Sequence, residues 1–386
     1  MKIKKTLGLF LTLLLFFNTL FAFSKEPVKI RVAVLKDTEE ATLAISGSFN
    51  ILKAGTKELL YRGKNLALSK VVLAAGGLKI KDMLFNTGSL LIVSKRKAGI
   101  TVNNRSYRGD IAISRTPDNK LLIVNTLDLE FYVKGVLYHE ISHQWPLEAI
   151  KAQAVAARTY AVYQKEANAL KDYDLTADTS SQVYGGFGSE QYKTNRAVNF
   201  TTGEVLQYKG KVFPAYFHAT CGGMTESAHE LWNIDIDPLK GERVCSFCLG
   251  SPHYYWKAAM DLSAIQKKLG GAYSLSGDLN NIVVGERNST GRVRTLELKS
   301  ASGDSINISA KDFRAILGPD VIRSTNFSIL IDAEHVIFSG KGWGHGVGLC
   351  QWGALGMSRK GYNYKEILAF YYPGSEIVKM PVGTDV

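Results

Sequence analysis

One carboxylate, Glu140, follows a run of apolar residues with helical spacing and precedes an alanine-rich segment. Apolar side chains recur at three to four positions over residues 129–137, which predicts a helix with Glu140 next on the same face. Partial desolvation and the negative end of the helix dipole both raise the pKa of a carboxyl group there, and a protonated carboxyl group can act as a general acid. The alternative is that Glu140 turns to solvent or pairs with Lys134 or His143.

The segment DTSSQVYGG, at residues 178–186, carries a dense row of hydrogen-bonding side chains. Hydroxyl and amide groups of this kind suit the hydroxyls and acetamides of sugars. The alternative is a polar turn that Asp178 caps. The candidate substrate-binding residues of this segment are Asp178, Thr179, Ser180, Ser181, Gln182 and Tyr184.

The segment GWGHGVGLCQWGALGM, at residues 342–357, surrounds His345 with four glycines. Glycine lets a backbone approach a ligand closely or adopt a strained turn. His345 and Gln351 are therefore candidates to position a substrate or to stabilise charge beside Glu140. The alternative is a glycine-rich turn in which Trp343 and Trp352 only pack.

Together, these three segments resemble the signature blocks of the stage II sporulation protein D and amidase-enhancer family. The resemblance runs from about Leu129 to Pro373 and includes TTGEVLQYKGKVFPAYFHATCGGMTES and YYPG. It implies a glycan-cutting activity with Glu140 as the catalytic residue, and we add Arg158, in the alanine-rich helix, to the candidate substrate-binding residues.

One carboxylate is enough for the activity that the resemblance implies. Most glycosidases need two carboxyl groups, one as acid and one as nucleophile or base. In a lytic transglycosylase the 6-hydroxyl of N-acetylmuramic acid attacks its own anomeric carbon, so the nucleophile is already tethered. A single glutamate can protonate the leaving oxygen and then accept the hydroxyl proton. The family name also allows a non-catalytic, wall-binding enhancer of an amidase, and a sugar-binding envelope scaffold is a third possibility.

Three cysteines and two histidines are close enough in sequence to suggest a metal site: Cys221, Cys245, Cys248, His218 and His253. Three thiolates and one imidazole would complete a closed, tetrahedral zinc site. An exported protein could instead form a disulfide from Cys221 to Cys245 or Cys248. The resemblance to sporulation proteins that carry zinc near this region favours one structural zinc. Cys350 lies apart in the glycine-rich segment, so we expect a buried small residue without a second thiol nearby.

The N-terminal residues 1–24 have the pattern of an export signal. Three lysines precede an apolar run over residues 7–17, and cleavage after Ala22 or Ser24 is plausible. Residues 7–23 could also remain as an uncleaved membrane anchor. Either case predicts that the rest of the chain is exported to a periplasmic, cell-wall or membrane-anchored extracytoplasmic location.

The chain is basic, with a formal net charge of +12, of which about +9 remains without the three signal lysines. This charge favours an anionic partner. Export and the lack of a nucleic-acid-binding motif argue against nucleic acid, so cell-wall polymers or anionic lipid surfaces suit the location better. The family resemblance implies peptidoglycan glycan strands as the partner, with an amidase as a further candidate. The alternative is that the charge serves only solubility.

The 386 residues are enough for two or three domains. Alternating apolar residues and turn glycines over 25–127 predict a β-rich accessory region. Residues 128–380 mix helical and strand patterns, including a hairpin over 282–298, a short helix over 312–318 and a C-terminal helical pair. We therefore predict an α+β fold with a catalytic body over 128–380.

Overall fold

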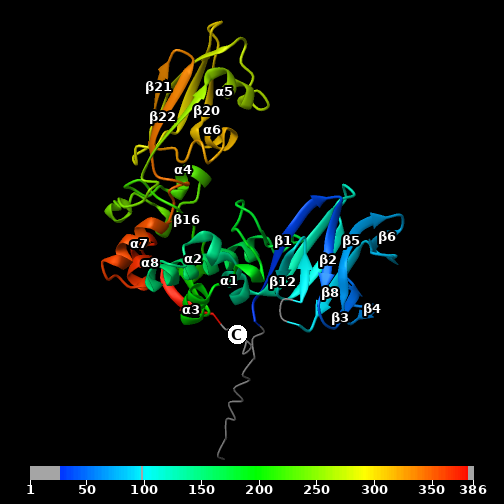
Figure 1. Cartoon of the computed structure of the whole chain (residues 1–386). Coiled ribbons are helices and arrows are strands. Elements are labelled where there is room, and N and C mark those ends of the chain that lie inside the picture. The colour runs from blue at the N-terminus through cyan, green and yellow to red at the C-terminus, as the bar shows by residue number, and fades with distance from the viewer. Residues whose placement is uncertain (1–26, 97–98, 381–386) are drawn as a thin grey trace, which may run out of the picture.

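The computed structural model describes residues 27–96 and 99–380. The predicted signal peptide or anchor, residues 1–24, lies outside the described residues. Within them, no helix is both long enough and apolar enough to cross a membrane. Figure 1 shows a helical body with a β region on one side and a second β lobe above it.

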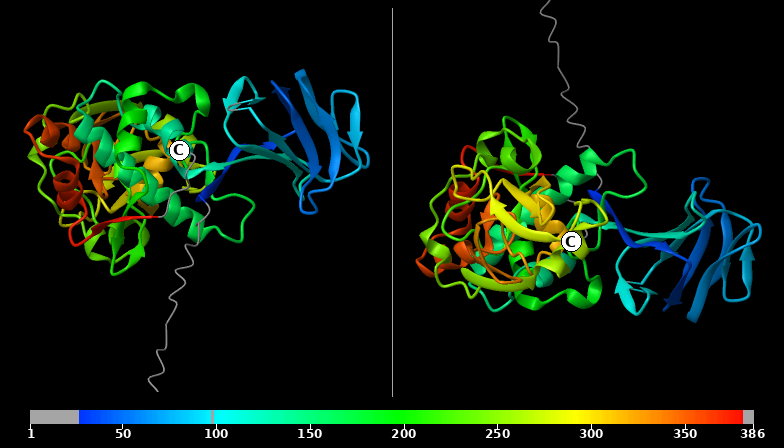
Figure 2. Two further views of the ribbon diagram at one scale, coloured as in Figure 1. Left: turned by 90° about the horizontal axis from the view of Figure 1, so that it is seen from below. Right: turned by 90° about the horizontal axis from the view of Figure 1, so that it is seen from above.

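The N-terminal β region contains twelve strands: β1 (Lys29–Thr38), β2 (Glu40–Ile45), β3 (Phe49–Lys53), β4 (Leu59–Gly63), β5 (Leu66–Ala74), β6 (Gly77–Ile80), β7 (Met83–Phe85), β8 (Ser89–Ser94), β9 (Ile100–Val102), β10 (Arg105–Tyr107), β11 (Asp110–Arg115) and β12 (Leu121–Asp128). Together with β13 (Leu175–Thr176), they form a seven-stranded sheet, β13-β1-β12-β11-β8-β3-β4, and a six-stranded sheet, β10-β9-β2-β5-β6-β7. Alternate side chains such as Ile30 and Val32 are buried between layers. Both views in Figure 2 show this region extending away from the helical body.

The helical body is built from α1 (Leu129–Glu140), α2 (Leu147–Ala167), α3 (Tyr192–Phe200), α4 (Ala228–Trp232), α7 (Gln351–Arg359) and α8 (Tyr364–Tyr371). Short segments connect them: β13 (Leu175–Thr176), η1 (Phe187–Ser189), β14 (Glu204–Tyr208), β15 (Lys211–Val212), β16 (Phe217–His218), η2 (Asp237–Leu239), η3 (Ser246–Cys248), β23 (Leu349–Cys350) and β24 (Glu376–Lys379). The alanines of α2 are buried, apart from Ala167 at its end, because their small side chains allow neighbouring helices to pack closely.

The third part, the β lobe, lies between β17 (Tyr255–Asp261) and β22 (His335–Lys341). It also contains α5 (Leu262–Leu269), β18 (Leu279–Val284), β19 (Thr295–Ser300), β20 (Ser305–Ser309), α6 (Ala310–Leu317) and β21 (Phe327–Asp332). Two three-stranded sheets, β17-β22-β21 and β18-β19-β20, enclose their own apolar cluster around Phe313 and Phe338. The expected hairpin is present as the antiparallel pair β18 and β19.

The mixed α+β prediction is confirmed, because helices and sheets share the described chain. The hydrophobic core of the N-terminal β region continues into α1 and α2, through residues such as Tyr132 and Ile150. A second cluster joins α2 to α7 and α8, and the β lobe has a third. The domain boundaries at 24/25 and 127/128 stay predictions.

Candidate functional site

Glu140 is the last residue of α1, as the apolar spacing predicted. Asp128 caps the start of the helix, because its carboxylate accepts a hydrogen bond from the backbone N–H of Glu130. At its other end, the backbone N–H of Val183 donates to Oε1 of Glu140 at 3.2 Å, and the Gln351 side chain also donates to this carboxyl group. None of the ion pairs among the described residues includes Glu140, so it does not pair with Lys134 or His143.

The environment of Glu140 favours its protonated form. Burial is the largest influence and raises the pKa of its carboxyl group to about 7, although the hydrogen bonds from Val183 and Gln351 act in the opposite direction. The residue keeps some exposed surface, while its carboxyl group is largely enclosed by protein. No second carboxylate among the described residues contributes to this rise in the pKa of Glu140. Glu140 is therefore an acid whose pKa lies near neutrality.

Part of the polar segment after β13 lines a small pocket of about 190 Å³. Thr179, Ser180 and Ser181 contribute one wall, and His345 contributes another. Asp178 caps this turn, because its carboxylate accepts hydrogen bonds from the Thr176 hydroxyl and the Ser180 backbone. Burial opposes ionisation of Asp178, but these hydrogen bonds outweigh it and lower its pKa. Asp178 is thus an exposed, ionised capping residue.

Three candidate substrate-binding residues lie in the interior, with their polar groups bonded to protein partners. Gln182 accepts from the Tyr132 hydroxyl at 3.0 Å, and Tyr184 donates to the Asn125 side chain at 3.0 Å. Arg158 has no exposed surface and forms a bidentate pair with Glu130, at 2.8 and 2.7 Å. Gln182, Tyr184 and Arg158 therefore support the site in this structure rather than line it.

The glycine-rich segment wraps its backbone around His345. Gly342, Gly344, Gly346 and Gly348 all have positive φ, between 69° and 110°, a region that disfavours side chains. The Nδ1 atom of His345 accepts a hydrogen bond from the Val347 N–H at 3.0 Å.

His345 is neutral at physiological pH. Burial is the main cause that lowers its pKa to about 3, and the cationic Arg314 lowers it further, while a hydrogen bond to the Phe217 carbonyl acts against both. A neutral ring that the backbone holds in place can orient a ligand, but it does not supply a positive charge.

The cysteines form a different cluster from the predicted one. Cys221, Cys245, Cys248 and Cys350 are all buried, and their sulfur atoms lie within 4.8 Å of one another. The expectation that Cys350 stands apart is wrong, because the parallel pairing of β16 with β23 brings it beside the segment that contains Cys221. All four cysteines are unbridged in this structure.

This sulfur cluster fits a tetrahedral zinc ion. Four thiolates at the usual Zn–S distance of about 2.3 Å are separated by roughly 3.8 Å, which the cluster can accommodate. The backbone N–H groups of Cys221 and Gly353 each donate to the Cys350 sulfur at 3.3 Å, a contact that stabilises a thiolate. The predicted histidine ligands lie outside this cluster: the His218 ring donates to the Val347 carbonyl, and His253 packs edge-on against Trp343.

Several aromatic residues of the pocket had no signal in the sequence that marked them as site residues. Tyr216 stacks on Trp232 with ring centroids 4.3 Å apart, and both line the same pocket as His345. Tyr160, from α2, lines the pocket as well. Ser181 also lines the pocket, and Val183, two residues later, donates its N–H to Glu140, so the pocket lies close to the carboxyl group of Glu140.

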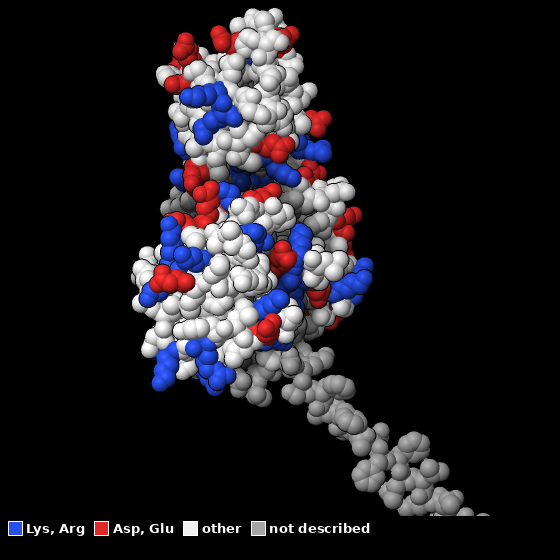
Figure 3. Space-filling view, turned by 90° about the vertical axis from the view of Figure 1, so that its right-hand side faces the viewer, with Lys and Arg blue, Asp and Glu red and all other residues white. Residues whose placement is uncertain are grey.

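The charge of the molecule is not concentrated on one surface in Figure 3, where basic and acidic side chains are interspersed over the face shown. This view gives no support for a broad basic binding surface. On this face, any preference for an anionic ligand must come from smaller groups of residues.

Comparisons with known proteins cover both the helical body and the β lobe. A family model described as Stage II sporulation protein matches residues 117–208, and one described as a domain of unknown function, DUF8618, matches residues 226–348. An uncharacterized protein of Brachyspira hyodysenteriae is 35% identical over 94% of this chain and 95% of its own length. The stage II sporulation protein D of Bacillus amyloliquefaciens is 30% identical over 66% of this chain and 75% of its own length.

The amidase enhancer of Bacillus subtilis is 28% identical over 88% of this chain. The match spans 52% of that protein, so about half of the enhancer has a counterpart here.

Proposed function

This chain belongs to the stage II sporulation protein D and amidase enhancer family, and we propose that it is a lytic transglycosylase that cleaves peptidoglycan glycan strands. The observation that carries the proposal is the Glu140 carboxyl group, whose pKa is raised to about 7 beside a polar and aromatic pocket. Such a group is partly protonated and partly ionised at neutral pH, as a residue that first donates and then accepts a proton requires.

The proposed reaction needs Glu140 and the substrate's own hydroxyl. Glu140 protonates the glycosidic oxygen while the bond to the anomeric carbon of N-acetylmuramic acid breaks. The carboxylate then removes the proton from the 6-hydroxyl of the same sugar, and that oxygen closes the 1,6-anhydro ring. Gln351 and the Val183 N–H hold the carboxyl group in one orientation through this cycle.

The pocket supplies groups that suit the acetamides and hydroxyls of the two sugars. Thr179, Ser180 and Ser181 offer hydroxyls, and Trp232 and Tyr216 offer stacked aromatic surface. His345 adds a neutral imidazole, so its proposed role is to orient the sugar and not to balance charge.

Zinc, if bound, would be held by Cys221, Cys245, Cys248 and Cys350. Four thiolates leave no open coordination position, so the ion would supply structural cross-linking between these segments. We assign it no part in bond cleavage.

We propose that the reaction occurs outside the cytoplasmic membrane, where peptidoglycan lies, and the N-terminal export pattern supports this location. Glycan strands that have lost their stem peptides carry free lactyl carboxylates, which suit a basic protein. A second candidate function, enhancement of an N-acetylmuramoyl-L-alanine amidase, is favoured by the match to the amidase enhancer.

The test is to incubate purified protein with peptide-free glycan strands and to identify the products by mass spectrometry. Ends of 1,6-anhydro-N-acetylmuramic acid that depend on Glu140 support the transglycosylase. Uncut strands, together with stimulation of a purified amidase on intact peptidoglycan, would favour the enhancer instead.

A further inference from the structure

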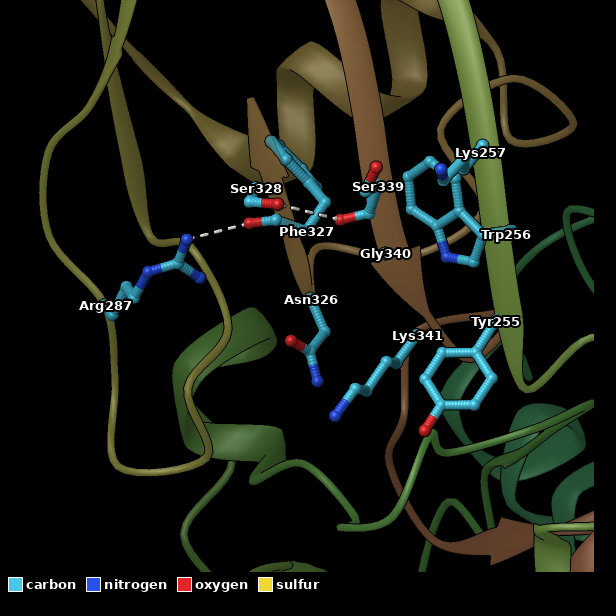
Figure 4. Close-up of a pocket in the computed structure, with 10 residues that line it drawn as sticks. All are labelled: Tyr255, Trp256, Lys257, Arg287, Asn326, Phe327, Ser328, Ser339, Gly340 and Lys341. Carbon is cyan, nitrogen blue, oxygen red and sulfur yellow. Dashed lines mark hydrogen bonds between the residues drawn. The ribbon is translucent and has the colours of Figure 1, made fainter. Parts of the chain in front are cut away.

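A second and larger pocket, of about 630 Å³, lies in the β lobe and shares no lining residue with the pocket beside Glu140. Figure 4 shows it at the end of the β17-β22-β21 sheet. Its principal lining side chains are Tyr255, Trp256, Lys257, Arg287, Phe327 and Lys341.

The strand register builds this pocket. Tyr255 pairs across the sheet with Lys341, and Trp256 pairs with Gly340. A Cβ atom on Gly340 would lie 2.3 Å from the Trp256 ring, so only glycine allows the indole to rest on this strand. Tyr255 is 68% exposed; the Lys341 Nζ atom lies over its ring at 5.6 Å from the centroid, and the exposed part of the ring can contact a ligand.

All the charged residues that line the pocket are basic. Lys257, Arg287 and Lys341 line it, and no acidic residue does. Among the described residues, none of these three cations takes part in an ion pair. Arg287 is held in place, because it donates to the Gly291 carbonyl at 2.7 Å and to the Phe327 carbonyl at 2.8 Å.

Trp256 provides an unused hydrogen-bond donor. Its side chain is only 5% exposed, and its indole N–H has no partner among the described residues. A buried donor without an acceptor costs free energy unless a ligand supplies the acceptor. In Figure 4 the indole nitrogen is on the side of the ring that faces Tyr255 and Lys341.

We infer that this pocket binds a carboxylate-bearing sugar of a glycan strand. The cations suit a carboxylate, the exposed Tyr255 suits a sugar ring, and the Trp256 N–H suits an acetamide or hydroxyl oxygen. N-acetylmuramic acid without its stem peptide has all three features. A phosphate polymer would use the cations but not the aromatic surface.

The pocket is connected directly to the segment that carries His345 and Gln351. Lys341 ends β22, and the next residue, Gly342, donates its N–H to the Tyr254 carbonyl at 2.9 Å. The inference rests on the proposed function, because it makes this pocket an accessory site for the strand that Glu140 cuts. It also gives a ligand to the region that matches the domain of unknown function.

Binding can be tested without cleavage in the full chain carrying Glu140→Gln. The probe is a peptide-free tetrasaccharide of alternating N-acetylglucosamine and N-acetylmuramic acid, titrated by calorimetry. We expect two binding events per chain. Lys341→Gln and Tyr255→Ala should each weaken the same one of these events by roughly tenfold, because both residues line the pocket of the β lobe. Lys267→Gln, which removes an exposed charge elsewhere in the β lobe, should weaken neither.

Two comparisons decide the outcome. Chitotetraose lacks the lactyl carboxylate, so its binding should not respond to Lys341→Gln; an equal response would overturn the carboxylate assignment. A single binding event that Lys341→Gln and Tyr255→Ala leave unchanged would overturn the accessory site, even if the unmutated protein cuts strands. Loss of one event in a protein that cuts no strands would support the site and reject the proposed cleavage.

Discussion

The chemistry of the site depends on how burial and two hydrogen bonds set the pKa of the Glu140 carboxyl group. Burial raises the pKa of Glu140, while the Val183 N–H and the Gln351 amide stabilise its ionised form. A general acid must be protonated at the start of each cycle. Activity limited by this step should therefore fall as the pH rises through about 7, the pKa of Glu140.

Gln351→Met should shift the fall in activity, described above, to higher pH. The methionine keeps much of the volume but removes the amide donor that favours the carboxylate, so the pKa of Glu140 should rise. The measurement is kcat/KM for strand cleavage across pH 5 to 9. Gln191→Met is the matched control, because Gln191 makes no capping hydrogen bond with its side chain. If the pH at which kcat/KM falls is unchanged or lower in Gln351→Met, this role for Gln351 is contradicted.

Helical spacing predicted Glu140 at a helix end, because it acts over a few residues, but it left open whether the carboxyl group is desolvated or turns to solvent. Residue types alone did not predict which polar residues would be accessible. Gln182, Tyr184 and Arg158 have suitable chemistry, yet tertiary packing buries them against protein partners. Burial of this kind depends on contacts from distant parts of the chain.

The glycine-rich segment shows how an element restricts its own sequence. Gly346 has φ of +89°, and a Cβ atom there would lie 2.6 Å from the Arg292 side chain. Gly361 has φ of +92°, but a Cβ atom there would meet nothing within 4 Å. Both positions thus have a backbone conformation that disfavours side chains, but only at Gly346 would an added Cβ atom collide with a neighbouring side chain.

We expect Gly361→Ala to cost about 1 to 2 kcal/mol of unfolding free energy, from the left-handed backbone alone. Gly346→Ala should cost at least about 1 kcal/mol more, and it should impair cleavage because His345 is the preceding residue. Urea unfolding of both variants provides the comparison. Equal losses would mean that the contact with Arg292 is relieved without cost.

The elements with regular patterns were predictable, and those set by long-range pairing were not. The helix before Glu140, the hairpin of β18 and β19, and the C-terminal helices α7 and α8 all follow local periodicity. The parallel pairing of β16 with β23 has no local signal, because its partners are distant in the chain. That pairing is why Cys350 was wrongly placed apart from the other thiols.

The cysteine cluster brings together segments of the helical body that are far apart in sequence. Cys221 follows β16, Cys245 and Cys248 flank and end the η3 turn, and Cys350 precedes α7. These residues belong to the hydrophobic cluster that also contains α8. A metal bound here would link these segments of the helical body.

We expect purified protein to contain about one zinc per chain and to melt at lower temperature after treatment with a chelator. Cys350→Ser should reduce the zinc content, whereas His253→Gln should retain it, since His253 lies outside the cluster. Elemental analysis with thermal melting provides both readouts. Metal-free protein with two of its cysteines oxidised would contradict the zinc site and support the disulfide alternative.

At the largest scale, the sequence predicted a β-rich N-terminal region and a mixed body, and it missed the separate core of the β lobe. Residues 255–341 alternate strands and helices much as the preceding body does, so composition gives no boundary there. The lobe became visible only through its own buried cluster. It places a second polar pocket on the same chain as Glu140.

The most direct test of the account is the end group left on cut strands. Peptide-free glycan strands incubated with the unmutated protein should end in 1,6-anhydro-N-acetylmuramic acid, and Glu140→Gln should lower the cleavage rate by roughly 10²-fold or more. Circular dichroism and strand binding should remain unchanged in this variant. Mass spectrometry that finds ordinary reducing ends, or equal cleavage by Glu140→Gln, would contradict the account.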